Sequence, residues 1–176
     1  MLANGEVPFE WTEKIDGQNI SVEWTGYEVL FHGRTEKAEL PKELLDYLEE
    51  KFKGNTAEQV FEQVFGDKRV ILYGEGYGGK IQGGVYDGSE RFVLFDIYFP
   101  DSDIWADSMT MVGIANSFDI DTVPIIFIST VEEAIEFVKS YTDERYFEGL
   151  VGKPIVELRN RGSERIILKV KVKDFQ

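Results

Sequence analysis

The chain of 176 residues has no cysteine and only one histidine, His32. Without cysteine there is neither a disulfide nor a thiolate metal site. A single histidine excludes multi-histidine metal centres and argues against a serine–histidine triad. The apolar runs are shorter than a bilayer span, and residues 1–10 lack the basic and then apolar layout of a signal peptide. We therefore expect a cytoplasmic protein without a membrane segment.

Basic residues are also scarce, with 19 Lys and Arg against 33 Asp and Glu and a net charge of −14. This charge repels polyanions at long range, so a nucleic-acid partner would have to meet a local basic surface. An apolar content of 43 % is typical of a globular protein. Since no repeat or linker divides the chain, we expect one domain over residues 1–176.

Hydrophobic periodicity predicts a mixture of strands and helices. The predicted strands are 9–14, 19–24, 27–32, 69–73, 92–99, 155–158 and 165–172. The predicted helices are 41–52, 56–65, 108–118 and 131–140, the last opened by a capping box from Thr130 to Glu133. The strands bracket the helices without a regular βαβ alternation, which favours the α+β class.

The first chemical signature is the stretch Glu13-Lys14-Ile15-Asp16-Gly17-Gln18-Asn19. A lysine on a rigid element, flanked by groups that hold sugar and phosphate, suits an enzyme that forms a covalent lysine–nucleotide adduct. A lysine beside an Asp-Gly turn is also typical of a solvated hairpin. The stretch alone leaves both interpretations open.

The last predicted strand places Lys169, Lys171 and Lys173 on one face and apolar residues on the other. A solvated lysine face is the simpler interpretation. However, neighbouring like charges repel each other, and a phosphate bound against that face would relieve the repulsion.

Five further residues carry chemistry only if their surroundings allow it. Glu75, within Tyr73-Gly74-Glu75-Gly76-Tyr77-Gly78, is either a ligand for sugar hydroxyls or an exposed hairpin residue. Asp96 lies in an aromatic strand, where a buried carboxylate needs a cation or donor. Phe95 is a core residue or a stacking platform for a nucleobase. Glu148 faces a metal or occupies a turn, and Arg34 clamps a phosphate or is solvated.

Five of these signatures occur in the order of the nucleotidyltransferase motifs I, III, IIIa, IV and V. They are Lys14-Ile15-Asp16-Gly17, Gly74-Glu75-Gly76, Phe95-Asp96, Glu148-Gly149-Leu150-Val151 and Lys169-Val170-Lys171. The chain therefore resembles the superfamily of ATP-dependent DNA ligases, RNA ligases and mRNA capping enzymes. Asn19 and the ending from Lys169 to Phe175 are most similar to the RNA ligase 2 family in its small phage-encoded forms.

The resemblance implies an ATP-grasp-like α+β nucleotidyltransferase domain with two antiparallel sheets flanked by helices. It implies an ATP-dependent RNA repair enzyme that joins a 5′-phosphate to a 3′-hydroxyl through lysyl-AMP, with Mg²⁺ or Mn²⁺. Lys14 would be the nucleophile, with Lys169 and Lys171 on the phosphates. The implied nucleotide-binding residues are Glu13, Asp16, Asn19, Arg34, Glu75, Phe95 and Glu148, and the implied metal ligands are Glu148 and Asp96.

The chain departs from larger relatives because no C-terminal OB or helical domain is expected within 176 residues. We therefore expect that a partner protein can supply part of the substrate binding. Two alternatives stay open. One is a related enzyme that acts on nicked DNA or uses GTP, and the other is a non-catalytic nucleotide-binding module of a repair complex.

Overall fold

The structure is a computed structural model that describes residues 7–35 and 39–175. The chain forms two compact units: unit 1 is Met1–Ile15 with Val123–Gln176, and unit 2 is Asp16–Thr122. The prediction that residues 1–176 act as one domain is not tested by this division. Among the described helices, none has the length and hydrophobicity that a bilayer span requires.

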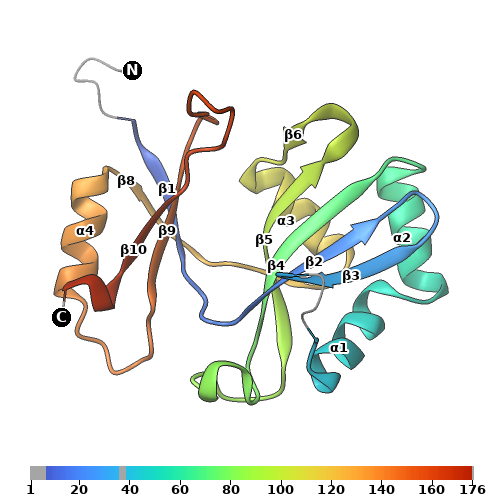
Figure 1. Cartoon of the computed structure of the whole chain (residues 1–176), viewed down its shortest axis with the longest axis horizontal. Coiled ribbons are helices and arrows are strands. Elements are labelled where there is room, and N and C mark those ends of the chain that lie inside the picture. Colours follow the sequence, from blue (N-terminus) through green and yellow to red (C-terminus); the bar gives the residue numbers. More distant parts are fainter. Residues whose placement is uncertain (1–6, 36–38, 176) are drawn as a thin grey trace. The chain divides into compact units, whose positions relative to one another are not determined.

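Unit 1 is a four-stranded antiparallel sheet covered on one face by a helix (Figure 1). The strand order is β10-β9-β1-β8. The helix packs on this sheet because Ala134 and Val138 are buried against Trp11, Leu150 and other apolar residues of the strands. The elements are β1 (Phe9–Glu13), β8 (Ile125–Ser129), α4 (Val131–Ser140), β9 (Gly149–Pro154), β10 (Leu168–Lys171) and the 3₁₀ helix η3 (Val172–Phe175).

Unit 2 is a six-stranded sheet with three helices. The strands β3-β2-β4-β5-β6 are antiparallel, and short β7 adds a parallel pair to β5. The strands are β2 (Gln18–Trp24), β3 (Val29–Gly33), β4 (Val70–Tyr77), β5 (Arg91–Phe99), β6 (Ile104–Trp105) and β7 (Asp121–Thr122). The helices are α1 (Lys42–Phe52), α2 (Asn55–Phe65) and α3 (Ser108–Ser117), with 3₁₀ turns η1 (Ile81–Gly83) and η2 (Pro100–Ser102).

The helices of unit 2 contribute to one apolar core with the sheet. Leu44, Leu48 and Phe52 of α1 are fully buried and belong to the same cluster as Ile20 and Leu72 of the strands. Since side chains alternate along a strand, the residues between these core positions point to the opposite face of the sheet. That opposite face carries Asn19 and Glu75.

The predicted α+β class with two antiparallel sheets flanked by helices is confirmed. The predicted capping box is also present: the Thr130 hydroxyl accepts from the Glu133 backbone N–H, and the Glu133 carboxylate accepts from the Thr130 N–H. These bonds satisfy backbone donors that a helix start leaves without partners.

Two strand predictions near the C-terminal end are wrong in their bounds. The predicted strand at 155–158 is absent, because the apolar stretch that pairs with β1 and β10 is 149–154 instead. The predicted strand at 165–172 pairs only over Leu168–Lys171, and the chain then turns into η3. Lys173 therefore lies on η3, and the strict alternation that placed it beside Lys169 and Lys171 ends before it.

Candidate nucleotidyltransferase site

The lysine signature begins where β1 ends in unit 1. Lys14 follows the last strand residue, and its backbone N–H donates to the Gly149 carbonyl at 2.9 Å. Its Nζ lies 2.5 Å from Oε2 of Glu148. The other oxygen of this carboxylate, Oε1, lies 3.1 Å from Nζ of Lys171. One carboxylate therefore bridges the predicted nucleophile and one of the two predicted phosphate-binding lysines.

The strand pairing explains how residues far apart in the sequence form this cluster. β9 lies between β1 and β10, with Lys171 opposite Gly149 in the register. Glu148 immediately precedes β9, so its side chain stands at the same end of the sheet as Lys14 and Lys171. The side chains of Lys14 and Glu148 are 18 % and 13 % exposed, which leaves them open to a ligand from solvent.

Lys169 belongs to the same strand but not to the same ion pairs. It lies opposite Val151 in the register and is exposed. Since it lies two positions before Lys171 along a strand, both side chains leave the sheet on the same face. Within residues 7–35 and 39–175, Lys169 forms no ion pair, which keeps its charge available for an anion.

Glu13 is buried although it is charged. Its residue is 3 % exposed, and Oε2 accepts hydrogen bonds from Nη1 and Nη2 of Arg145 at 3.2 and 3.1 Å. Oε1 is buried, and no described group hydrogen-bonds to it. A side-chain hydrogen bond to Tyr141, which has the larger effect, and another to Glu13 raise the pKa of the Arg145 guanidinium. This partner of Glu13 therefore stays charged. The pair ties β1, one residue before Lys14, to the loop that leads to Glu148.

Arg145 was missed by the sequence interpretation. The only sequence signal is a single cation directly after Asp143 and Glu144, which is typical of a solvated loop. Its partner Glu13 lies 132 positions away, so only the folded chain reveals the pair. Burial of Glu13 makes the pair necessary, because an uncompensated buried carboxylate is costly.

In unit 2, the Asp16-Gly17 turn is held by a segment between β4 and β5. The backbone N–H of Asp16 donates to the Tyr86 hydroxyl at 3.1 Å, and the Gln82 amide donates to the Gly17 carbonyl at 3.0 Å. A Cβ on Gly17 would lie 2.2 Å from the Gly76 carbonyl oxygen, so only glycine fits there. Tyr86 and Gln82 carried no recognisable signal in the sequence.

Asn19 and Glu75 lie directly opposite each other on neighbouring strands β2 and β4. Both are half-buried on the sheet face that the helices leave uncovered. The glycine-rich segment around Glu75 is part of β4 and not a loop, which corrects the hairpin interpretation. Its glycines are required by packing, since a Cβ on Gly74 would lie 2.2 Å from the Phe92 ring and one on Gly76 2.4 Å from Leu44.

Phe95 and Asp96 lie at an irregularity in β5. The register between β4 and β5 shifts there, so Tyr73 faces Asp96 while Gly74 faces Leu94. Phe95 is the extra residue and is only half-buried, whereas Asp96 is 5 % exposed. Burial, and then the charges of Glu23 and Asp96, raise the pKa of the Tyr73 phenol, which keeps it a hydrogen-bond donor near this carboxylate. A bulge of this kind re-aims a side chain.

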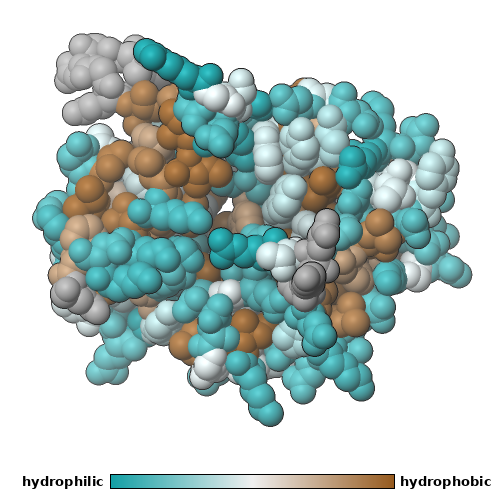
Figure 2. Space-filling model, viewed as in Figure 1, coloured by the Kyte–Doolittle hydropathy of each residue, from teal (hydrophilic) through white to brown (hydrophobic). Residues whose placement is uncertain are grey.

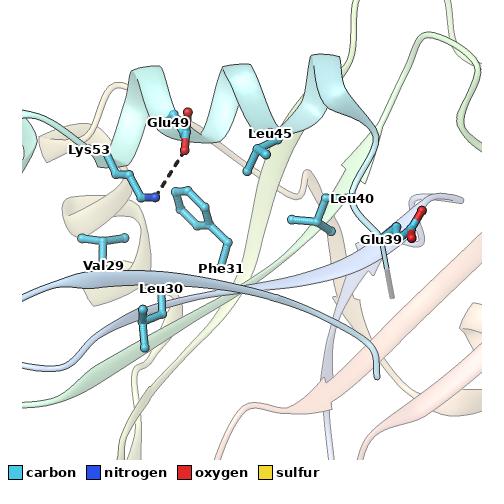
Figure 3. Close-up of a pocket in the computed structure, with 8 residues that line it drawn as sticks. All are labelled: Val29, Leu30, Phe31, Glu39, Leu40, Leu45, Glu49 and Lys53. Atoms are coloured by element: carbon cyan, nitrogen blue, oxygen red, sulfur yellow. Dashed lines mark hydrogen bonds and ion pairs between the residues drawn. The ribbon is translucent and has the colours of Figure 1, made fainter. Parts of the chain in front are cut away.

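Arg34 follows β3 and is exposed, with no ion pair in the part of the chain that the structure describes. A pocket of about 540 Å³ lies between β3 and α1 (Figure 3). Its lining includes Phe31, Leu40 and Leu45, with Lys53 over the Phe31 ring. This lining contains none of the predicted site residues, so we do not assign the pocket to the site.

The described residues contain no group of three or more acidic or histidine side chains that could hold a metal by themselves. Glu148 and Asp96 are nevertheless oxygen donors of the type that Mg²⁺ and Mn²⁺ prefer. Mg²⁺ commonly takes one or two carboxylates, keeps several waters and completes its shell with substrate phosphates. Each of these carboxylates by itself thus suits a hard cation that arrives with a nucleotide.

The family model described as RNA ligase matches residues 7–171. This chain belongs to the RNA ligase family. The match covers every predicted motif and agrees with the resemblance to the RNA ligase 2 group. Comparison with curated proteins gives no match.

Solved RNA ligases share the fold of this RNA ligase family member. An apo mutant of Naegleria gruberi RNA ligase is 20 % identical with a TM-score of 0.73, and the alignment covers 98 % of this chain and 51 % of that one. A mutant solved with ATP and Mn is 19 % identical with a TM-score of 0.74, covering 98 % and 51 %. One with AMP and Mn is 19 % identical with a TM-score of 0.73, covering 98 % and 52 %. The chain spans about half the length of these ligases.

Proposed function

We propose that this protein is an ATP-dependent RNA ligase that forms a covalent lysyl-AMP intermediate at Lys14. The observation that carries the proposal is the Lys14–Glu148–Lys171 cluster at one end of the four-stranded sheet, in a chain of the RNA ligase family. Related solved ligases contain ATP or AMP with Mn, which supports the same cofactors here. A cytoplasmic location and the action of residues 1–176 as one domain belong to this proposal.

The proposed reaction has three steps, and each is a nucleophilic attack on phosphorus. First, Nζ of Lys14 attacks the α-phosphorus of ATP, so a P–N bond forms and the P–O bond to pyrophosphate breaks. Second, the 5′-phosphate of an RNA end attacks the same phosphorus and releases Lys14. Third, a 3′-hydroxyl attacks the activated 5′-phosphate and releases AMP.

The ion pair of Lys14 is a resting arrangement that the first transfer must undo. An unperturbed lysine amine carries a proton at neutral pH and has no lone pair for attack. In the structure the amine is also occupied by its contact with Glu148. Lys14 must therefore lose both its proton and this contact before it can attack. Glu148 or Asp96 would hold a divalent cation, which would supply charge neutralisation for the triphosphate and the leaving pyrophosphate.

The other predicted residues receive roles consistent with their chemistry. Glu75 and Asn19 would accept from or donate to the ribose, and Phe95 would stack on adenine. Arg34 would contact a phosphate. Buried Glu13 would bind the nucleotide next to Lys14 through Oε1, the oxygen that does not contact Arg145. Asp16 would order the turn that follows the nucleophile.

The test is an intact-mass measurement after incubation of the purified chain with ATP and Mn²⁺. We expect the mass of one AMP to be added to the wild type and nothing to be added to Lys14→Ala. Lys139→Ala on α4 is a matched control that should label normally. Labelling with GTP in place of ATP would overturn the choice of nucleotide, and an adduct that persists in Lys14→Ala would overturn the nucleophile.

A further inference from the structure

Positive charge is concentrated in a small part of the chain. Unit 1 carries 12 Asp and Glu and 10 Lys and Arg, a net charge of −2, whereas unit 2 carries 21 and 9, a net charge of −12. Within unit 1, residues 153–173 contain seven Lys and Arg but only two Glu. This is the local basic surface that a polyanion would need on so acidic a protein.

The centre of this segment is the arginine hairpin, which we define as residues 155–167 between β9 and β10. Arg159 and Arg165 form an isolated antiparallel bridge across it. Its tip is a closed turn: the Asn160 side-chain oxygen accepts from the backbone N–H of Gly162 and Glu164 at 2.8 and 3.0 Å. These hydrogen bonds fix the backbone of the turn, so the tip of the hairpin has a defined conformation.

The turn presents Arg161 to solvent. Arg161 is exposed and forms no ion pair among the residues that the structure describes. At the base of the turn, Glu157 contacts Nε of Arg159 at 2.7 Å and Nε of Arg165 at 3.7 Å. One carboxylate shared by two guanidinium groups orients both and keeps them close to each other.

Apolar residues accompany these charges without being covered. Ile155, Val156 and Ile167 are 46, 63 and 40 % exposed. Figure 2 shows hydrophobic residues (brown) beside hydrophilic ones (teal) over the part of unit 1 that carries β9 and the hairpin in Figure 1. Guanidinium groups beside exposed aliphatic surface suit a ligand that has both phosphates and sugars.

We propose that the arginine hairpin binds the phosphodiester backbone of the RNA strand to be sealed. This rests on the proposed ligase function. β10 runs from the hairpin to Lys169 and Lys171, so a strand lying on the hairpin leads toward the proposed phosphate-binding lysines. All three basic residues of the hairpin are arginines, whose planar forks match phosphate oxygens in two contacts.

The test is RNA binding by the full chain, without ATP, over a salt series. Fluorescence anisotropy with a single-stranded 5′-phosphorylated RNA gives the affinity at each salt concentration. Arg161→Gln should bind roughly fivefold more weakly at low salt, as expected for an exposed charge contact. The slope of log K against log salt should fall by about 0.7, the value for one phosphate contact on a single strand. Arg161→Lys should keep most of the slope.

The matched control is Lys139→Gln, which removes one charge from unit 1 on the exposed side of α4. It should bind RNA as the wild type does, and all variants should label themselves with AMP equally. Wild-type binding and slope in Arg161→Gln would overturn the hairpin proposal even if labelling succeeds. Failure of labelling in the wild type would overturn the ligase function instead. If polyglutamate displaces the labelled RNA as well as unlabelled RNA does, the proposal that the hairpin binds RNA is overturned and an acidic protein partner is favoured.

Discussion

Gly149 allows the backbones of β9 and β10 to approach closely, next to the contacts of Glu148 with Lys14 and Lys171. Its φ is +147°, and an added Cβ would lie 2.1 Å from the Val170 carbonyl oxygen and 2.8 Å from Cα of Lys171. These neighbours are backbone atoms of β10, so no side-chain rotation can relieve the overlap. Gly149→Ala must therefore separate β9 from β10 or distort both.

The cost can be worked from these two effects. A side chain at an unfavourable φ costs about 1–3 kcal/mol, and overpacking adds about 1–3 kcal/mol more. For a chain of this length, each kcal/mol lowers the melting temperature by about 2–4 °C, so a combined cost of about 2–6 kcal/mol predicts a loss of roughly 4–24 °C. Self-adenylylation should also fall at a temperature where the variant is still folded, because Lys171 and Glu148 lie across the disturbed pair.

The assay is thermal unfolding by circular dichroism beside AMP labelling at about 15 °C, well below the expected transition of a mesophilic domain. Gly113→Ala is the matched control: Gly113 lies in α3, and its Cβ would meet no atom within 4 Å. That variant should gain about 0.5–1 kcal/mol, since alanine is the better helix former. The reasoning would be refuted if Gly149→Ala labels normally and melts within about 2 °C of the wild type, because a shift that small corresponds to less than about 1 kcal/mol.

Three further outcomes are expected. Lys169→Ala and Lys171→Ala should each reduce AMP labelling far more than Lys173→Ala, because Lys173 lies on η3; equal losses in a labelling assay would indicate a diffuse basic patch. Labelling should resist salt while sealing of nicked duplex and single-stranded RNA falls steeply with it, since a polynucleotide is held on a chain of net charge −14 by contacts between its phosphates and local basic groups, and salt weakens those contacts; salt-insensitive sealing would contradict this. Thr130→Ala should cost about 1 kcal/mol in urea unfolding by removing the α4 cap, with Thr130→Ser as the control that retains it; an unchanged midpoint in Thr130→Ala would show that the cap adds nothing.

The sequence by itself determined the features that depend on local chemistry. Alternating apolar residues and a capping box placed most strands and all four predicted helices, because backbone periodicity and helix-end donors are satisfied within a few residues. The motif order, from Lys14 through Glu75 and Glu148 to Lys171, also indicated the family, because the order of short motifs along a chain is a property of the sequence alone.

Only the tertiary structure decided which groups touch. Glu148 bridges Lys14 and Lys171, and Glu13 is buried against Arg145, because β9 lies between β1 and β10, an arrangement that no local pattern encodes. The reason for glycine at position 74 is likewise tertiary, since the Phe92 ring packs against it from the neighbouring strand. Contacts between residues more than a hundred positions apart depend on strand order and register, and these are set by packing of the whole sheet.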